Sequence, residues 1–192
     1  YESVSYVTDS KVVIQALGER QPLFELSLNP PLGLPKVTGE LDPAEIDLGR
    51  QLFFDRRLSN NETLSCAMCH IPEQGFTQNE LATPVGHLGK GGRRNVPSLY
   101  NVAFTKNFFL DGRERSLEQQ IWSPLLAENE MANESREAVL AKLALNPRYT
   151  ARFAETFDEG LTERTLGRVL AAYQRALLSG DCLLYTSDAA DE

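Results

Sequence analysis

Residues 65–70 read SCAMCH: two cysteines lie three positions apart, and a histidine directly follows the second. The chain of 192 residues contains three cysteines and two histidines, so this hexapeptide takes two of the three thiols and one of the two imidazoles. Three cysteines are too few for a disulfide framework in a chain of this length. The clustering of Cys66, Cys69 and His70 therefore indicates a binding site.

Three kinds of site contain a Cys-x-x-Cys pair. A thioredoxin-like redox pair belongs to a βαβ unit, and nothing before Cys66 resembles a strand. A zinc site needs a second pair of ligands, and the remaining candidates, His87 and Cys182, are not placed for it. The full Cys-x-x-Cys-His pattern is typical of c-type haem attachment, in which both thiols bond to the haem and the histidine binds iron. We therefore predict one haem c held by Cys66, Cys69 and His70.

The composition limits the class of protein. The chain is 42% hydrophobic and 24% charged, which is ordinary for a globular protein. A formal net charge of -8 argues against a nucleic-acid partner. No apolar run approaches the ~18 residues that a membrane-spanning helix needs. The chain opens with Tyr1, so we expect that a leader has been removed or that the chain is an internal fragment.

A helix is predicted directly before the haem motif, in residues 41–59, LDPAEIDLGRQLFFDRRLS. Asp42 is placed to cap it, Pro43 suits its first turn, and Glu45 would complete a capping box. Gly49 lies inside this helix, at a cost of about 1 kcal/mol relative to alanine. That cost predicts a second helix that crosses closely at Gly49.

The last strong helix is predicted in residues 162–180, TERTLGRVLAAYQRALLSG, with an apolar stripe and Gly180 placed to end it. Three shorter helical segments precede it: LEQQIW (117–122), SREAVLAKLAL (135–145) and RYTARFAETF (148–157). No segment alternates convincingly with period two. The fold class is therefore predicted to be all-α, a cytochrome c-like haem domain with long loops.

Three regions are expected along the chain. Residues 1–36 form an N-terminal arm, and the four prolines within 20–36 predict that this part is extended or a linker. Residues 37–181 form the haem domain. The tail, 182–192, reads CLLYTSDAADE and continues no pattern before it. We expect a foreign or truncated end there, with Cys182 adventitious.

Six motifs, in this order, resemble the N-terminal half of bacterial dihaem cytochrome c peroxidases over about residues 30–181. They are LGRQLFFDRRLS, SCAMCH, VGHLGKGGRRNVPSLYNVAF, FFLDGRERSLEQQ, ENEM and AAYQRALLSGD. The resemblance implies a periplasmic enzyme that reduces hydrogen peroxide to water with electrons from a small c-type cytochrome or a cupredoxin. It also implies a second haem domain, expected to begin where this chain stops, and a homodimer when the protein is full length.

Two residues are candidates for the second axial position on the iron. Met131 follows His70 by 61 residues, a plausible distance for the methionine of a small electron-transfer cytochrome. His87 lies in a glycine-rich loop, GHLGKGGRR, which could move a ligand on and off the iron. The alternative is that His87 is an ordinary histidine of a surface loop. The resemblance implies that His87 is the removable distal ligand of the resting enzyme and that Met131 packs.

Peroxide cleavage needs a group that takes a proton from one peroxide oxygen and returns it to the other. The resemblance implies that Glu130 performs this transfer and that Gln120 orients the peroxide. From the residues alone, a Glu-Gln-Gln run on a helix is more typical of a solvated face. The resemblance further implies that Asn95 helps to hold a calcium ion between the two haem domains, whereas by itself Asn95 reads as a turn residue.

Leu110 departs from the family pattern, because many members have tryptophan there, between the two haems. The route of electrons and the subgroup stay open, since the family also includes enzymes that oxidise tryptophan residues of partner proteins. A further alternative is a monohaem electron-transfer cytochrome with His70 and Met131 as ligands and no catalysis.

Overall fold

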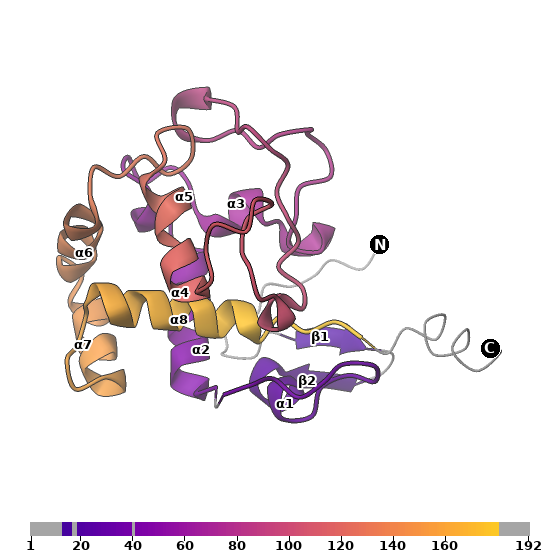
Figure 1. Ribbon diagram of the computed structural model, residues 1–192. Coiled ribbons are helices and arrows are strands. Elements are labelled where there is room, and N and C mark those ends of the chain that lie inside the picture. Colours follow the sequence, from indigo (N-terminus) through magenta and orange to yellow (C-terminus); the bar gives the residue numbers. More distant parts are fainter. Residues whose placement is uncertain (1–12, 17–18, 40, 181–192) are drawn as a thin grey trace.

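The computed structural model describes residues 13–16, 19–39 and 41–180, and the predicted tail with Cys182 lies outside them. Figure 1 shows α8 crossing α2 at the centre, with α6 and α7 gathered at one end of α8. The strands are β1 (Val13–Ala16) and β2 (Glu19–Pro22); the α-helices are α1 (Leu23–Leu28), α2 (Pro43–Phe53), α3 (Cys66–Cys69), α4 (Leu117–Gln120), α5 (Trp122–Leu126), α6 (Arg136–Ala144), α7 (Pro147–Thr156) and α8 (Glu163–Arg175). Short 3-10 turns are η1 (Arg56–Leu58), η2 (Pro72–Gln74), η3 (His87–Gly89) and η4 (Val102–Phe104). The helical class predicted from the sequence is confirmed.

The N-terminal arm contains more regular structure than its prolines indicated. Strand β1 pairs antiparallel with β2, from Val13 opposite Pro22 to Ala16 opposite Glu19. Helix α1 follows at once, because the fixed φ of Pro22 (-58°) suits the residue that precedes a helix. Leu23 of α1 is buried in the core, which anchors the arm to the domain. Residues 29–39 contain turns and bends but no helix or strand.

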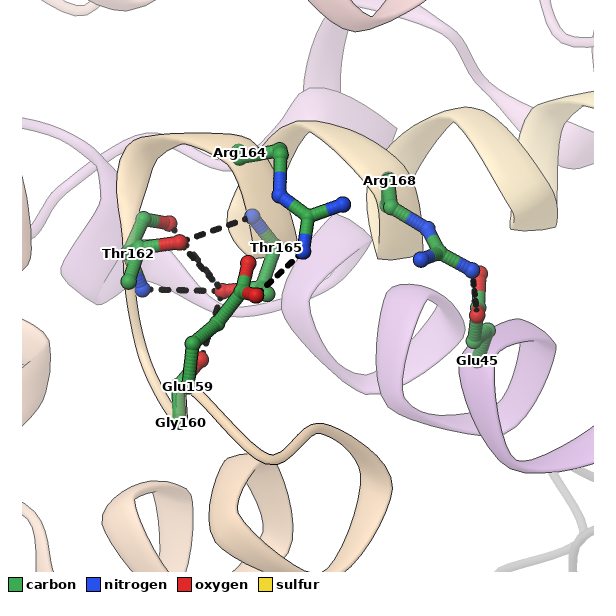
Figure 2. Close-up of polar contacts among 7 residues, drawn as sticks. All are labelled: Glu45, Glu159, Gly160, Thr162, Arg164, Thr165 and Arg168. Atoms are coloured by element: carbon green, nitrogen blue, oxygen red, sulfur yellow. Dashed lines mark hydrogen bonds and ion pairs between the residues drawn. The ribbon is translucent and has the colours of Figure 1, made fainter.

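Helix α2 begins as predicted. The Asp42 carboxylate accepts hydrogen bonds from the backbone N–H of Ala44 (2.6 Å) and of Glu45 (3.4 Å), and Pro43 occupies the first turn. Glu45 does not complete the predicted capping box. Its carboxylate instead pairs with Arg168 of α8 (Figure 2), so the side chain joins two helices rather than closing one.

The crossing of α2 and α8 requires a glycine. A β-carbon added at Gly49 would lie 1.8 Å from the carbonyl oxygen of Val169 and 3.0 Å from the β-carbon of Tyr173. No other residue allows the two backbones to approach so closely. The close crossing predicted from Gly49 is therefore confirmed, and beside it the Phe53 and Tyr173 rings pack 5.1 Å apart between centroids.

Side-chain hydrogen bonds define the start of α8 (Figure 2). The Thr162 hydroxyl accepts from the N–H of Thr165 at 3.1 Å, and the Thr165 hydroxyl accepts from the N–H of Thr162 at 2.8 Å, which forms a capping box. The other end differs from the prediction, because α8 stops at Arg175. Gly180 does not end the helix; it lies against the arm, where a β-carbon would be 2.7 Å from that of Pro31.

Replacing Gly49 with alanine tests the crossing. Helix propensity favours alanine by about 1 kcal/mol, but the new methyl group meets the Val169 carbonyl and forces the helices apart. We expect a net loss of about 2 kcal/mol or more in the free energy of unfolding. Urea denaturation of the haem-loaded protein measures it. Gly91→Ala is the matched control, because its β-carbon finds its nearest neighbour at 4.0 Å. A Gly49→Ala protein as stable as wild type would contradict the crossing.

Candidate functional site

Helix α3 is a single turn that carries both predicted haem-attachment thiols. Cys66 and Cys69 are free, and the backbone N–H of His70 donates to the Cys66 carbonyl at 2.9 Å, which closes the turn. Burial raises the pKa of Cys66 to about 12 and also raises that of Cys69. Both groups are therefore protonated thiols at neutral pH, unlike the thiolate of a reactive redox pair. Within the described ranges, no cluster of three or more His, Cys, Asp or Glu side chains is arranged to hold a metal ion.

A backbone carbonyl orients His70. Nδ1 of the imidazole lies 3.0 Å from the carbonyl oxygen of Phe76, a residue whose φ is +55°. Because Nδ1 donates this bond, Nε2 remains as the nitrogen that can bind iron. Burial lowers the pKa of His70, although the carbonyls of Phe76 and Pro97 oppose the change, so the ring is neutral, the form that binds a metal.

An aromatic cluster separates His70 from the helix crossing. The ring of Phe53 on α2 lies 6.4 Å from that of His70 and 6.1 Å from that of Phe76, and Phe76 meets Tyr100 edge-on at 5.4 Å. Phe53 and Phe76 are buried, and Tyr100 is half-buried. The haem motif therefore rests on the packed core rather than on a mobile loop.

The loop that carries His87 is held against the segment between α5 and α6. The backbone N–H of His87 donates to the carbonyl of Glu130 at 2.9 Å. A β-carbon at Gly86 would lie 2.1 Å from the carbonyl oxygen of Asn129, so glycine is required for this contact. Nδ1 of His87 is buried and has no hydrogen-bond partner among the described residues. An unpaired buried polar atom costs about 1–3 kcal/mol, and it fits a histidine that meets a further group when haem is bound.

Glu130 lies next to His87 through this hydrogen bond. Its residue surface is exposed, yet the protein around the carboxyl group removes enough water to raise its pKa, and only Arg113 acts against that change. The Glu130 charge in turn raises the pKa of the Cys69 thiol, which places the carboxylate near the haem motif. Gln120 ends α4 and is half-buried, and among the described residues its side chain forms no hydrogen bond.

The other predicted residues have different surroundings. Met131, directly after Glu130, is 6% exposed and belongs to the same hydrophobic cluster as Phe53 and Phe76. Asn95 is exposed, and its side-chain oxygen accepts from the N–H of Val96 at 2.6 Å, as in a local turn. Leu110 is 88% exposed. None of their side chains takes part in the hydrogen bonds of His70 and His87 described above.

Two contributions to the site were missed in the sequence. Phe76 acts through its carbonyl group, which every residue type has, so its identity carries no signal. Only Gly75 before it indicated a turn, and both residues have a positive φ. Arg113 belongs to the motif FFLDGRERSLEQQ, but no role at the site was predicted for it. It pairs with Asp111 at 2.9 Å, and it is also the cation that opposes the rise in the pKa of Glu130.

Comparisons with known proteins agree with these features. The family model described as di-haem cytochrome c peroxidase matches residues 43–187, and so runs into the predicted tail. Cytochrome c peroxidase Ccp of Escherichia coli is 32% identical over 140 residues, which are 73% of this chain and 30% of that protein. The methylamine utilization protein MauG of Methylorubrum extorquens is 38% identical over 143 residues, covering 73% and 40%.

Solved structures give the same picture. A MauG-like protein associated with microbial copper homeostasis superposes with a TM-score of 0.69 at 29% identity, over 85% of this chain and 48% of that one. The diheme peroxidase BthA of Burkholderia thailandensis superposes with a TM-score of 0.61 at 31% identity, over 70% of this chain and 38% of that one. The chain spans less than half the length of these relatives. Its helical fold and its matched motifs place it in the di-haem cytochrome c peroxidase family.

Proposed function

We propose that this chain is the peroxide-reducing haem domain of a periplasmic dihaem peroxidase. Two electrons and two protons would convert one hydrogen peroxide molecule into two water molecules. The electrons would come from a small c-type cytochrome or a cupredoxin, through a second haem in the remainder of the full-length protein. The observation that carries the proposal is the 2.9 Å hydrogen bond from the backbone N–H of His87 to the backbone carbonyl of Glu130, whose carboxylate also raises the pKa of Cys69 in the haem motif.

The residues of α3 fit the attachment of haem c. Cys66 and Cys69 would form the two thioether bonds, and His70 would bind the iron through Nε2 while the Phe76 carbonyl holds Nδ1. When bound, the haem supplies the iron and the electrons for peroxide reduction. His87 would be a second, removable ligand of the haem iron.

Glu130 is proposed to move the proton. Its carboxylate would take a proton from one peroxide oxygen and return it to the departing oxygen. Burial raises the pKa of Glu130, and a pKa nearer neutrality suits a group that both accepts and releases a proton. Gln120 would orient the peroxide through its amide, which is free of other hydrogen bonds among the described residues.

Several finer features of the full-length enzyme belong to the same proposal. Asn95 would contribute to a calcium site shared with the second domain, and the protein would be a homodimer.

In the ranges that the structure describes, no helix is long and apolar enough to cross a bilayer.

A protein oxidase is the second candidate. Leu110, where many relatives have tryptophan, is 88% exposed, and this chain is 38% identical to a MauG protein. The same haem residues would then serve oxidation of a partner protein. The electron-carrier alternative has less support, because the family model that matches residues 43–187 is described as di-haem cytochrome c peroxidase.

Covalent attachment gives the first test of the site. Two thioether bonds should keep the haem with the polypeptide through acid-acetone extraction, which removes haem held only by an axial ligand. Cys66→Ala should leave little haem-loaded protein, whereas Cys182→Ser, outside the motif, should retain full haem content. Absorbance of the extracted polypeptide measures both, and loss of all haem from the wild type would exclude the attachment.

Removal of the His87 imidazole tests the distal ligand. His87→Gly should give a high-spin ferric haem that binds cyanide without prior reduction, because the second axial side is then open. Optical and electron paramagnetic resonance spectra report the spin state. The same low-spin spectrum in wild type and His87→Gly would show that another residue, with Met131 the first candidate, occupies that side.

Glu130 and Gln120 should differ in their effect on rate. In the full-length enzyme, Glu130→Gln removes the proton carrier, which typically costs roughly 10²–10⁴-fold. Gln120→Leu removes one orienting hydrogen bond, worth about 1–3 kcal/mol, or roughly 10- to 100-fold. Stopped-flow absorbance after mixing with hydrogen peroxide measures both rates, and haem content and resting spectrum should not change.

The pH profile separates the two residues further. Because the carboxylate form of Glu130 accepts the proton, the wild-type rate should fall as the pH drops through its pKa, which burial raises above its ordinary value. Gln120→Leu should keep this profile, and Glu130→Gln should lose it. A Glu130→Gln rate within a few-fold of wild type would mean that the glutamate is structural.

A further inference from the structure

Lys142 on α6 lies at the centre of a polar cluster that none of the roles above uses. We call Lys142 and Asn133, with the carbonyl groups that they bind, the clip. The Lys142 ammonium donates to the carbonyls of Ser59 (2.5 Å) and Asn60 (3.4 Å) and to Oδ1 of Asn133 (3.1 Å). An ammonium group has three N–H donors. Each donor therefore has an acceptor, and all three acceptors lie outside α6.

The Asn133 side chain is fully bonded as well. It is 4% exposed, and its Nδ2 donates to the carbonyls of Leu58 (2.7 Å) and Leu125 (2.8 Å), while its Oδ1 accepts from Lys142. A buried amide with every donor and its acceptor satisfied holds its neighbours in one arrangement. Here the neighbours are the segment 58–60, the segment 125–133 and helix α6.

The clip carries a charge that no acid in the described part of the chain neutralises by direct contact. Burial lowers the pKa of Lys142, and the more distant Glu62 only partly opposes this. The bonds to the carbonyls are therefore charge-assisted hydrogen bonds, which are stronger than neutral ones. A shorter or uncharged side chain at position 142 would leave the buried amide oxygen of Asn133 without a donor, whereas the Ser59 carbonyl would keep only the N–H of Glu62 at 3.2 Å.

Both segments that the clip joins lead directly to the candidate site. The N–H of Asn60 donates to the carbonyl of Met131 at 2.9 Å, next to Glu130, whose own carbonyl accepts from His87. On the other side, the hydroxyl of Ser59 accepts from the N–H of Leu64 at 2.9 Å, two residues before Cys66. One network therefore runs from the haem-attachment segment to the segment of Glu130 and His87.

We propose that Lys142 and Asn133 are positioning residues, which hold Glu130 and His87 at a fixed place relative to the haem-attachment motif. Neither side chain contacts the thiols or His70 among the described contacts. The inference rests on the proposed function only for the roles of Glu130 and His87. The mechanical connection itself comes from the hydrogen bonds.

The test uses Lys142→Met in the full-length, haem-loaded protein. Methionine keeps most of the apolar stem and removes all three hydrogen bonds. We expect unchanged covalent haem content, because the α3 residues are intact, but a larger high-spin fraction in the resting ferric spectrum. The reaction with hydrogen peroxide should slow by roughly 10- to 100-fold, the range that a displaced catalytic group can cost. Lys142→Arg, which restores a cationic donor to the carbonyls, should recover part of both signals.

Two controls separate positioning from general destabilisation. Val139→Ala shortens a fully buried side chain one turn earlier on α6 and leaves the clip intact. It should lower the thermal midpoint but keep the wild-type spectrum. Lys106→Met removes a lysine outside the clip and should behave as wild type. If Val139→Ala shifts the spin state as much as Lys142→Met does, the clip has no specific role and the inference is overturned.

The outcomes also separate this inference from the proposed function. A wild type that reduces peroxide, with Lys142→Met unchanged in spectrum and rate, overturns the clip and leaves the peroxidase proposal standing. A wild type that does not reduce peroxide, with a high-spin shift in Lys142→Met alone, supports the clip and removes the peroxidase proposal.

Discussion

The backbone contact between α2 and α8 is the constraint on which the rest of the structure depends. The absence of a side chain at Gly49 lets the carbonyl of Val169 approach α2, and this approach brings Phe53 onto Tyr173. Phe53 in turn supports His70 and Phe76. The haem motif follows α2 by a short segment, so its place is set by where α2 crosses α8. A wider crossing would loosen the aromatic support behind the proposed iron ligand.

Backbone groups, rather than side chains, assemble the candidate site. The Phe76 carbonyl orients His70, and the Glu130 carbonyl holds His87. These segments contain several residues with positive φ, including Phe76 and Leu88, and each such residue costs free energy that the surrounding packing must offset. Loops of this kind keep one conformation only when they are bonded to a rigid core. Hydrogen bonds from the clip and the contact at Gly86 supply that connection.

Burial shifts the pKa of each titratable group of the site so that its neutral form is favoured. It raises the pKa of Cys66, Cys69 and Glu130 and lowers that of His70. Neutral thiols, a neutral imidazole and a carboxyl group with a raised pKa would suit the apolar surroundings of a bound haem. The ion pair of Arg168 with Glu45 lies elsewhere, between α8 and α2 (Figure 2).

From the sequence alone, the helical class, the cap at Asp42 and the close crossing at Gly49 could be predicted, because each depends on local spacing or on one residue type. The capping role of Glu45 and the helix end at Gly180 were wrong, because an ion pair with Arg168 and a contact with Pro31 override the local patterns. Only the tertiary structure brought His87 to Glu130 and Lys142 to Asn133. Such contacts join segments far apart in the chain through backbone carbonyls, which leave no signature in the order of the residues.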